Sequence, residues 1–285
     1  MNEIIERIVR THAPESAGKR LSFIKLNTAG SPMRGKPKVL FLCFFNEEQF
    51  PAFCLKTVRS KGHNAVITEG FGVLQQLEKI AGGKNLFPRS IWQGEDDSIA
   101  WSIESAFAGR KPVAGDTTNI VDAYFDFARA SLPRKRIANG EEVAKKLIAD
   151  IDCSSEDKKA LEALWKEVAI PEIILLPQHG DFTPDNILVA REGVHVVDCD
   201  RFLPEGVAGF DIFYFLVRTL QTKSDVTAYL QKYCEIVGMS RSFSAGDLLL
   251  WGLQDEVVKK ESNFPFSLKN FTRWYQDLRS AKLIS

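Results

Sequence analysis

Long apolar runs and paired cysteines are both missing from this sequence. None of its hydrophobic stretches approaches the ~20 residues that cross a bilayer. The acidic start Met1–Glu6 lacks the cationic region of a signal peptide. The five cysteines are odd in number and contain no C-x-x-C pair, which excludes a disulfide framework and the usual zinc spacing. We therefore expect a cytoplasmic protein without a membrane span.

An excess of charge of one sign is also absent, because 37 Lys and Arg balance 37 Asp and Glu. Nucleic-acid-binding proteins usually carry a net positive surface, so we expect no nucleic-acid partner. One segment departs from this balance: residues 179–200 hold five acidic side chains against one basic side chain. Such a cluster must be well solvated or be neutralised by a bound cation.

The first part of the chain has the pattern of an antiparallel sheet with one helix. Apolar residues at three- and four-residue intervals from Ile67 to Ile80 predict an amphipathic helix that ends at Gly82. Residues 1–20 are interpreted as a short polar helix and a linker. Five β-rich runs are bounded by turn residues and predict strands at 21–27, 38–45, 51–58, 90–93 and 99–105.

Helical periodicity dominates the rest of the chain. The pattern is helical over 117–169, changes to short apolar runs over 173–200, and is helical again over 211–237 and 244–285. We therefore predict an α+β fold of two lobes. The N-terminal lobe, residues 1–107, would hold the five-stranded antiparallel sheet, and the mainly helical C-terminal lobe, residues 108–285, would include a helical insert at about 112–178.

The most informative motif lies in the acidic segment. Asp181 and Asn186 stand five residues apart in a loop, and Asp198 follows the next short strand. Phosphoryl transfer needs a carboxylate that accepts the proton of the attacking hydroxyl, together with an amide oxygen and a carboxylate that hold Mg²⁺. The three residues in this order therefore indicate phosphotransferase chemistry.

In this motif the sequence resembles the aminoglycoside phosphotransferase and choline kinase superfamily, small-molecule kinases of the two-lobed protein-kinase-like fold. The resemblance covers most of residues 21–220. It implies that Asp181 is the catalytic carboxylate and that Asn186 and Asp198 are metal ligands. Gly180 stands where protein kinases carry an arginine, which favours the small-molecule branch. Asp211 resembles the structural aspartate that braces the catalytic loop.

The resemblance also assigns residues of the N-terminal lobe to a nucleotide. Lys56 on the third strand would contact the α- and β-phosphates, and Glu69 on the following helix would orient it. Backbone groups near Glu104 and Ala106, at the end of the fifth strand, would bind the adenine edge. The 28–36 loop lacks the G-x-G-x-x-G pattern but lies where a phosphate loop is expected.

We therefore predict an ATP-dependent kinase that uses Mg²⁺, with GTP as the alternative nucleotide, and that phosphorylates a hydroxyl of a small molecule. Residues 201–285 sum to +2 and the insert to −3, which gives no strongly acidic wall for a polycationic aminoglycoside. A sugar or a saccharide unit fits this charge better. Choline or ethanolamine is an alternative acceptor, with Trp251, Trp274 and Tyr275 as its aromatic cage, and an aminoglycoside is another. A non-enzymatic, pseudokinase-like scaffold is the second class of function considered.

Overall fold

The computed structural model describes the chain except for residues 1, 13–15, 27–37, 220–222, 260–265 and 281–285. The expected 28–36 phosphate loop therefore lies outside the described residues. Backbone contacts divide the chain into two compact units. Unit 1 comprises Met1–Lys111 with Ile187–Asp200, and unit 2 comprises Pro112–Asn186 with Arg201–Ser285. The sequence predicted one boundary after residue 107. In the structure, unit 1 runs to Lys111 and also includes the later segment Ile187–Asp200.

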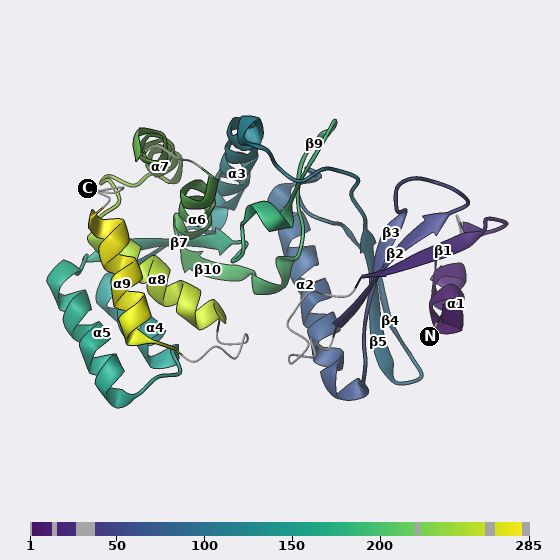
Figure 1. Ribbon diagram of the computed structural model, residues 1–285, viewed down its shortest axis with the longest axis horizontal. Helices are drawn as coiled ribbons and strands as arrows, with labels where there is room; N and C mark the ends of the chain where they lie inside the picture. Colours follow the sequence, from purple (N-terminus) through teal and green to yellow (C-terminus); the bar gives the residue numbers. More distant parts are fainter. Residues whose placement is uncertain (1, 13–15, 27–37, 220–222, 260–265, 281–285) are drawn as a thin grey trace. The chain divides into compact units, whose positions relative to one another are not determined.

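Unit 1 is built on a five-stranded antiparallel sheet, as predicted, with the strand order β1-β2-β3-β5-β4 (Figure 1). The central strands β2, β3 and β5 are rich in branched and aromatic residues, which suits a buried pleated surface. The strands span Leu21–Leu26 (β1), Lys38–Phe45 (β2), Phe53–Val58 (β3), Ser90–Asp96 (β4) and Ile99–Ser105 (β5).

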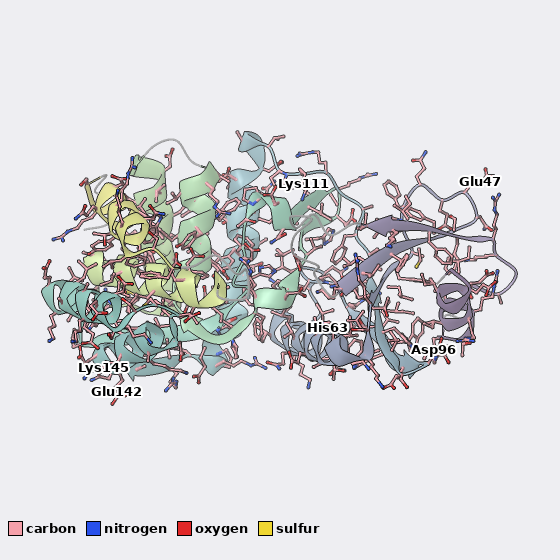
Figure 2. All side chains as sticks on the ribbon, turned by 60° about the horizontal axis from the view of Figure 1, so that its bottom comes forward. Glu47, His63, Asp96, Lys111, Glu142 and Lys145 are labelled. Carbon is pink, nitrogen blue, oxygen red and sulfur yellow. The ribbon has the colours of Figure 1, made fainter. Side chains whose placement is uncertain are left out.

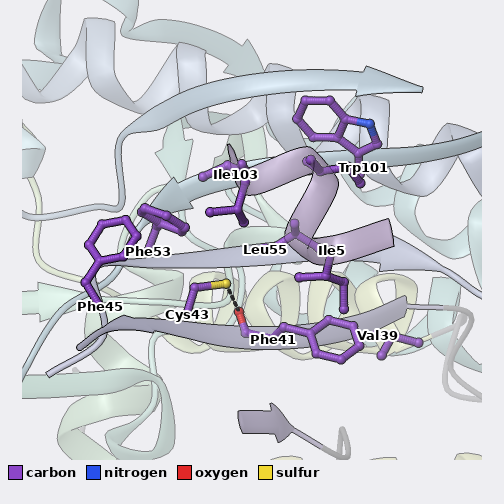
Figure 3. Packing of buried hydrophobic residues seen from close by; sticks show 11 residues of the cluster. Ile5, Val39, Phe41, Cys43, Phe45, Phe53, Leu55, Trp101 and Ile103 are labelled. Atoms are coloured by element: carbon purple, nitrogen blue, oxygen red, sulfur yellow. Dashed lines mark hydrogen bonds between the residues drawn. The ribbon is translucent and has the colours of Figure 1, made fainter. Parts of the chain in front are cut away.

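Helix α1 (Asn2–His12) covers one face of this sheet, where the sequence suggested only a polar helix and a linker. Its Ile5, Ile8 and Val9 are buried in a core with alternate residues of the strands, among them Leu55 and Trp101 (Figure 3). The described side chains on the rest of the helix are charged or polar, which is why the segment looked polar overall.

Helix α2 (Asn64–Ala81) covers the opposite face and matches the predicted helix. Its Ile67 packs with Val58 of β3 and Ala100 of β5. The helix ends at Gly82, whose φ of 60° lies in the left-handed region that glycine adopts without steric cost. Gly82 donates its backbone N–H to the carbonyl of Glu78 at 3.1 Å.

The hairpin of β8 (Ile187–Ala190) and β9 (Gly193–Val196) joins unit 1 through backbone hydrogen bonds. Val196 donates to the carbonyl of Leu86 at 2.7 Å, and Val189 donates to the carbonyl of Arg110 at 2.8 Å. The buried His195 stacks on Phe107 with ring centroids 3.9 Å apart. These contacts fix the residues that follow β9, including Asp198.

Unit 2 is mainly helical around a three-stranded antiparallel sheet of order β10-β7-β6. The sequence did not predict β10, because Pro204 and Gly206 are poor strand residues. The strands are β6 (Arg136–Asn139), β7 (Glu172–Gln178) and β10 (Leu203–Val207), and the helices are α3 (Thr117–Ser131), α4 (Gly140–Asp150), α5 (Ser155–Val168), α6 (Phe210–Thr219), α7 (Lys223–Val237), α8 (Ala245–Lys259) and α9 (Leu268–Ser280).

The insert helices follow the ordinary rules of capping and amphipathicity. Asn139 and Ser154 cap α4 and α5 by accepting backbone N–H groups, each at 3.1 Å. Glu142 and Lys145 project from the exposed side of α4 (Figure 2), whereas Ala144 of the same helix is buried. Among the described helices, none is both long enough and apolar enough to cross a membrane.

Candidate functional site

The loop after β7 is fixed by the close packing of its backbone. Gly180 has a φ of +83°, and a Cβ atom there would lie 1.9 Å from the backbone oxygen of Arg201. Position 180 therefore needs glycine for its conformation and for space. The backbone N–H of Asp181 donates to Nδ1 of His179 at 3.3 Å, so the histidine stabilises the loop.

Asp211, in the first turn of α6, anchors the same loop. Its carboxylate accepts the backbone N–H groups of His179 at 2.5 Å and of Gly180 at 2.9 Å. Burial raises the pKa of Asp211 to about 7, although these two donors favour the charged form. The bracing role that the resemblance implied for Asp211 therefore has a structural basis in these bonds.

Asp181 and Asn186 lie in this loop with their side chains in different roles. Asn186 donates its amide N–H to the backbone carbonyl of Asp181 at 2.9 Å, which leaves its side-chain oxygen available for another partner. The Asp181 carboxylate is about one-third exposed and has Nη1 of Arg201 at 3.6 Å. One short loop thus presents a carboxylate and an amide oxygen.

Asp198 is held in a strained backbone conformation directly after the β8–β9 hairpin. Its φ of 60° lies in the left-handed region, which residues other than glycine adopt uncommonly, although aspartate does so more readily than most. Its side chain is exposed, and the neighbouring Cys199 is buried. Strained backbone of this kind is concentrated at functional positions.

Lys56 of β3 is buried against a carboxylate from the neighbouring strand. Its Nζ lies 2.8 Å from Oε1 of Glu104 on β5, and the two side chains are only 11% and 8% exposed. Burial alone would lower the pKa of Lys56, but the negative groups around it, Glu104 foremost and Asp200 among them, together outweigh burial and raise that pKa. Lys56 therefore carries a stable positive charge inside unit 1.

A second buried lysine lies on the same face of the sheet. The register pairs Leu40 with Lys56, so Lys38, two residues before Leu40 on β2, points to the same side as Lys56. Lys38 forms an ion pair with Asp200, two residues after Asp198. The two lysines, Glu104 and Asp200 line a small pocket against Val66, Gly70 and Phe71 of α2.

The structure differs in two respects from the roles predicted for the nucleotide-binding residues. Lys56 pairs with Glu104, whereas Glu69 is exposed because it lies off the face of α2 that is turned to the sheet. The backbone of Glu104 lies inside a central strand between β3 and β4, so its side chain, and not its backbone, faces the pocket. Ala106 follows the last residue of β5 and is half-buried.

Lys38 and Asp200 had not been predicted as site residues. A signal existed for Asp200, which belongs to the acidic segment 179–200. Lys38 could not be found in this way, because its place on the face of Lys56 follows only from the β2–β3 register. The described residues contain no cluster of three or more His, Cys, Asp or Glu side chains that would hold a metal by themselves.

Solved structures with the same arrangement of elements come from small-molecule kinases. A candidate fructosamine-3-kinase from Haemophilus somnus 129PT aligns with a TM-score of 0.62 at 12% identity, over 96% of each chain. An amicoumacin kinase in complex with AMP-PNP and Ca²⁺ aligns with a TM-score of 0.55 at 9% identity, over 99% of this chain and 92% of the other. This chain has the protein-kinase-like fold.

Another protein of this fold is the aminoglycoside 2'-phosphotransferase-IIIa in its GDP complex, with a TM-score of 0.53 at 10% identity over 97% and 91% of the two chains. No family model matches the sequence, and no curated protein matches it either. In the protein-kinase-like fold, unit 1 corresponds to the part with the sheet and unit 2 to the helical part. At these identities the likeness concerns the fold alone.

Proposed function

We propose that the protein is a small-molecule kinase that transfers the terminal phosphoryl group of ATP to a hydroxyl. The observation that carries this proposal is the loop of Asp181 and Asn186. It presents a carboxylate suited to accept a hydroxyl proton and, five residues later, an amide oxygen suited to a divalent cation. GTP remains the alternative nucleotide, and one solved structure of the same fold is a GDP complex.

Each candidate residue has a role consistent with its surroundings. Asp181 would accept the proton of the acceptor hydroxyl as the oxygen attacks phosphorus. Lys56 would bind the α- and β-phosphates through its fixed positive charge. Backbone groups at Ala106, just beyond β5, would bind the nucleotide base. Asn186 and Asp198 would hold Mg²⁺, which prefers such oxygen ligands and would screen the negative charge of the phosphates.

The acceptor that we favour is a sugar or a saccharide unit. No strongly acidic segment in residues 201–285 would attract a polycationic antibiotic, since their formal charge is +2. Two of the solved structures with this fold are named for sugar compounds, an aminoglycoside and fructosamine. Both compounds are amino sugars, so their names favour a sugar-type hydroxyl. The preference for a neutral or anionic acceptor rests on the charge of residues 201–285 alone.

The aromatic residues of unit 2 argue against choline as the acceptor. Trp251 is fully buried, stacks on Phe213 with ring centroids 4.6 Å apart, and donates its indole N–H to Ala208 at 3.0 Å. Tyr275 is also buried, and its hydroxyl donates to Ala245 at 3.4 Å. Two of the three rings proposed for a quaternary-ammonium cage are therefore occupied in the core.

The function is tested by measuring ADP release with Mg·ATP over neutral sugars, choline, ethanolamine and aminoglycosides at equal concentrations. We expect the highest kcat/KM with a sugar. A kcat/KM for choline or an aminoglycoside far above that of every sugar would contradict the acceptor. Nucleotide binding without any transfer would favour the pseudokinase-like scaffold.

A further inference from the structure

The carboxylate that faces Lys56 comes from the sheet and not from helix α2. The positions of α2 that line the pocket are Val66, Ile67, Gly70, Phe71 and Leu74, and none of them carries a charge. A Cβ atom added at Gly70 would meet nothing within 4 Å. The α2 residues that line the pocket therefore supply no counter-charge for Lys56, and Gly70 leaves open space on this side of the helix.

Glu104, on the neighbouring strand β5, supplies the carboxylate that pairs with Lys56. Lys56 pairs with Ser102 and Cys54 pairs with Glu104 in the β3–β5 register, so Lys56 and Glu104 are diagonal neighbours on one face of the sheet. Their charged groups are 2.8 Å apart and both side chains are buried. Because the two strands are hydrogen-bonded to each other, this ion pair does not depend on where α2 lies.

One carboxylate oxygen of Glu104 could accept a further hydrogen bond. Its second carboxylate oxygen, Oε2, is buried and has no hydrogen-bond partner among the described residues. An unsatisfied buried oxygen of this kind is uncommon and requires an explanation. A carboxylate that presents one oxygen to Lys56 and keeps the other within the pocket is suited to orient the ammonium group while a ligand occupies the pocket.

We infer that Glu104 is the positioning residue of Lys56, in place of a carboxylate on α2. This inference rests on the proposed function, in which Lys56 binds the phosphates of ATP. Glu104 acts through the lysine: it keeps the ammonium charged and directed, and it does not touch the phosphates. Glu69, the helix residue that the sequence suggested for this role, has no part in it.

Calorimetry of Mg·ATP binding separates these assignments. Glu104→Gln removes the charge that fixes Lys56, and we expect ATP affinity to fall about tenfold or more, the usual scale for losing a charged hydrogen bond. Glu69→Gln tests the rival helix carboxylate, and Glu95→Gln on β4 is a matched exposed control; both should stay within about twofold of the unaltered protein. In steady-state assays Glu104→Gln should raise KM for ATP and leave KM for the acceptor unchanged.

Loss of Glu104 leaves a lysine in the interior without a counter-charge, which can destabilise the single variant for that reason alone. The double variant Lys56→Met/Glu104→Leu avoids this problem, because both members of the pair are apolar. If Glu104 acts by positioning Lys56 on the phosphates, the double variant binds Mg·ATP no more tightly than Glu104→Gln, which still carries the lysine.

The possible outcomes have distinct meanings. Unchanged affinity in Glu104→Gln, a loss in Glu69→Gln instead, or tighter binding by Lys56→Met/Glu104→Leu than by Glu104→Gln would overturn the inference while the kinase assignment stands. Tighter ATP binding by Glu104→Gln would also overturn it, because Glu104 would then compete with phosphate for Lys56. Absence of Mg·ATP binding in the unaltered protein would overturn both proposals.

Discussion

At the scale of single residues, the order of candidate groups was readable from the sequence but their contacts were not. Asp181, Asn186 and Asp198 stand out because carboxylate and amide groups recur at a spacing that phosphoryl transfer needs. The partner of Lys56 could not be read in the same way. The partner depends on how α2 is rotated about its axis. Gly70 faces the pocket, whereas Glu69, its neighbour in sequence, is exposed.

The requirement for glycine at position 180 gives a prediction at this scale. Gly180→Ala must accommodate both a left-handed backbone and the carbonyl of Arg201. Gly82→Ala is a matched control, because Gly82 is also left-handed but has open space around it. We expect Gly82→Ala to cost roughly 1–2 kcal/mol, and Gly180→Ala to cost clearly more. Urea unfolding of the two variants compares them directly, and equal losses would contradict this account of the loop.

At the scale of elements, most helices and strands of this chain follow from periodicity, and the exceptions have identifiable causes. β10 is paired with β7 despite a proline and a glycine, because tertiary pairing overrides its weak propensity. Helix α1 was expected only as part of a short polar helix and linker, because most of its side chains are polar or charged. Its contact with one face of the sheet could not be inferred without the sheet itself.

Helix α1 should contribute directly to the stability of unit 1. Ile5 is fully buried between the helix and the sheet, so Ile5→Ala creates a cavity and should cost about 2–5 kcal/mol. Glu6→Ala on the exposed side removes only an i,i+4 ion pair with Arg10 and should cost less than about 0.5 kcal/mol. Chemical unfolding measures both changes. A loss for Ile5→Ala no larger than that for Glu6→Ala would show that α1 does not hold the sheet.

The start of α6 predicts a pH dependence of stability. The pKa of Asp211 is about 7 in the folded protein, against an ordinary value of 3.8. Between these values the folded state binds a proton that the unfolded state has lost, so the free energy of unfolding contributed by Asp211 falls as pH rises from about 4 to about 7. Unfolding titrations across this range should show a decline that is reduced in Asp211→Asn. An identical pH profile in that variant would contradict the raised pKa.

At the scale of the whole molecule, the candidate groups are divided between two units. Lys56, Glu104 and Asp198 belong to unit 1, and Asp181 and Asn186 belong to unit 2. The sequence motif and the resemblance built on it predicted a kinase-like fold, and the chain has that fold, although the solved structures described above are at most 12% identical to it. This agreement concerns the fold, whereas the assignment of phosphoryl transfer rests on the residues of the motif.

The central claim is that Asp181 is the base of a phosphoryl transfer, and one measurement tests it most directly. Phosphorus NMR of Mg·ATP with a reactive sugar follows formation of the phosphomonoester by the unaltered protein and by Asp181→Asn. We predict the ester signal with the unaltered protein and a rate at least about 10²-fold lower in Asp181→Asn, with nucleotide binding retained. Ester formation by Asp181→Asn at the unaltered rate would contradict the account.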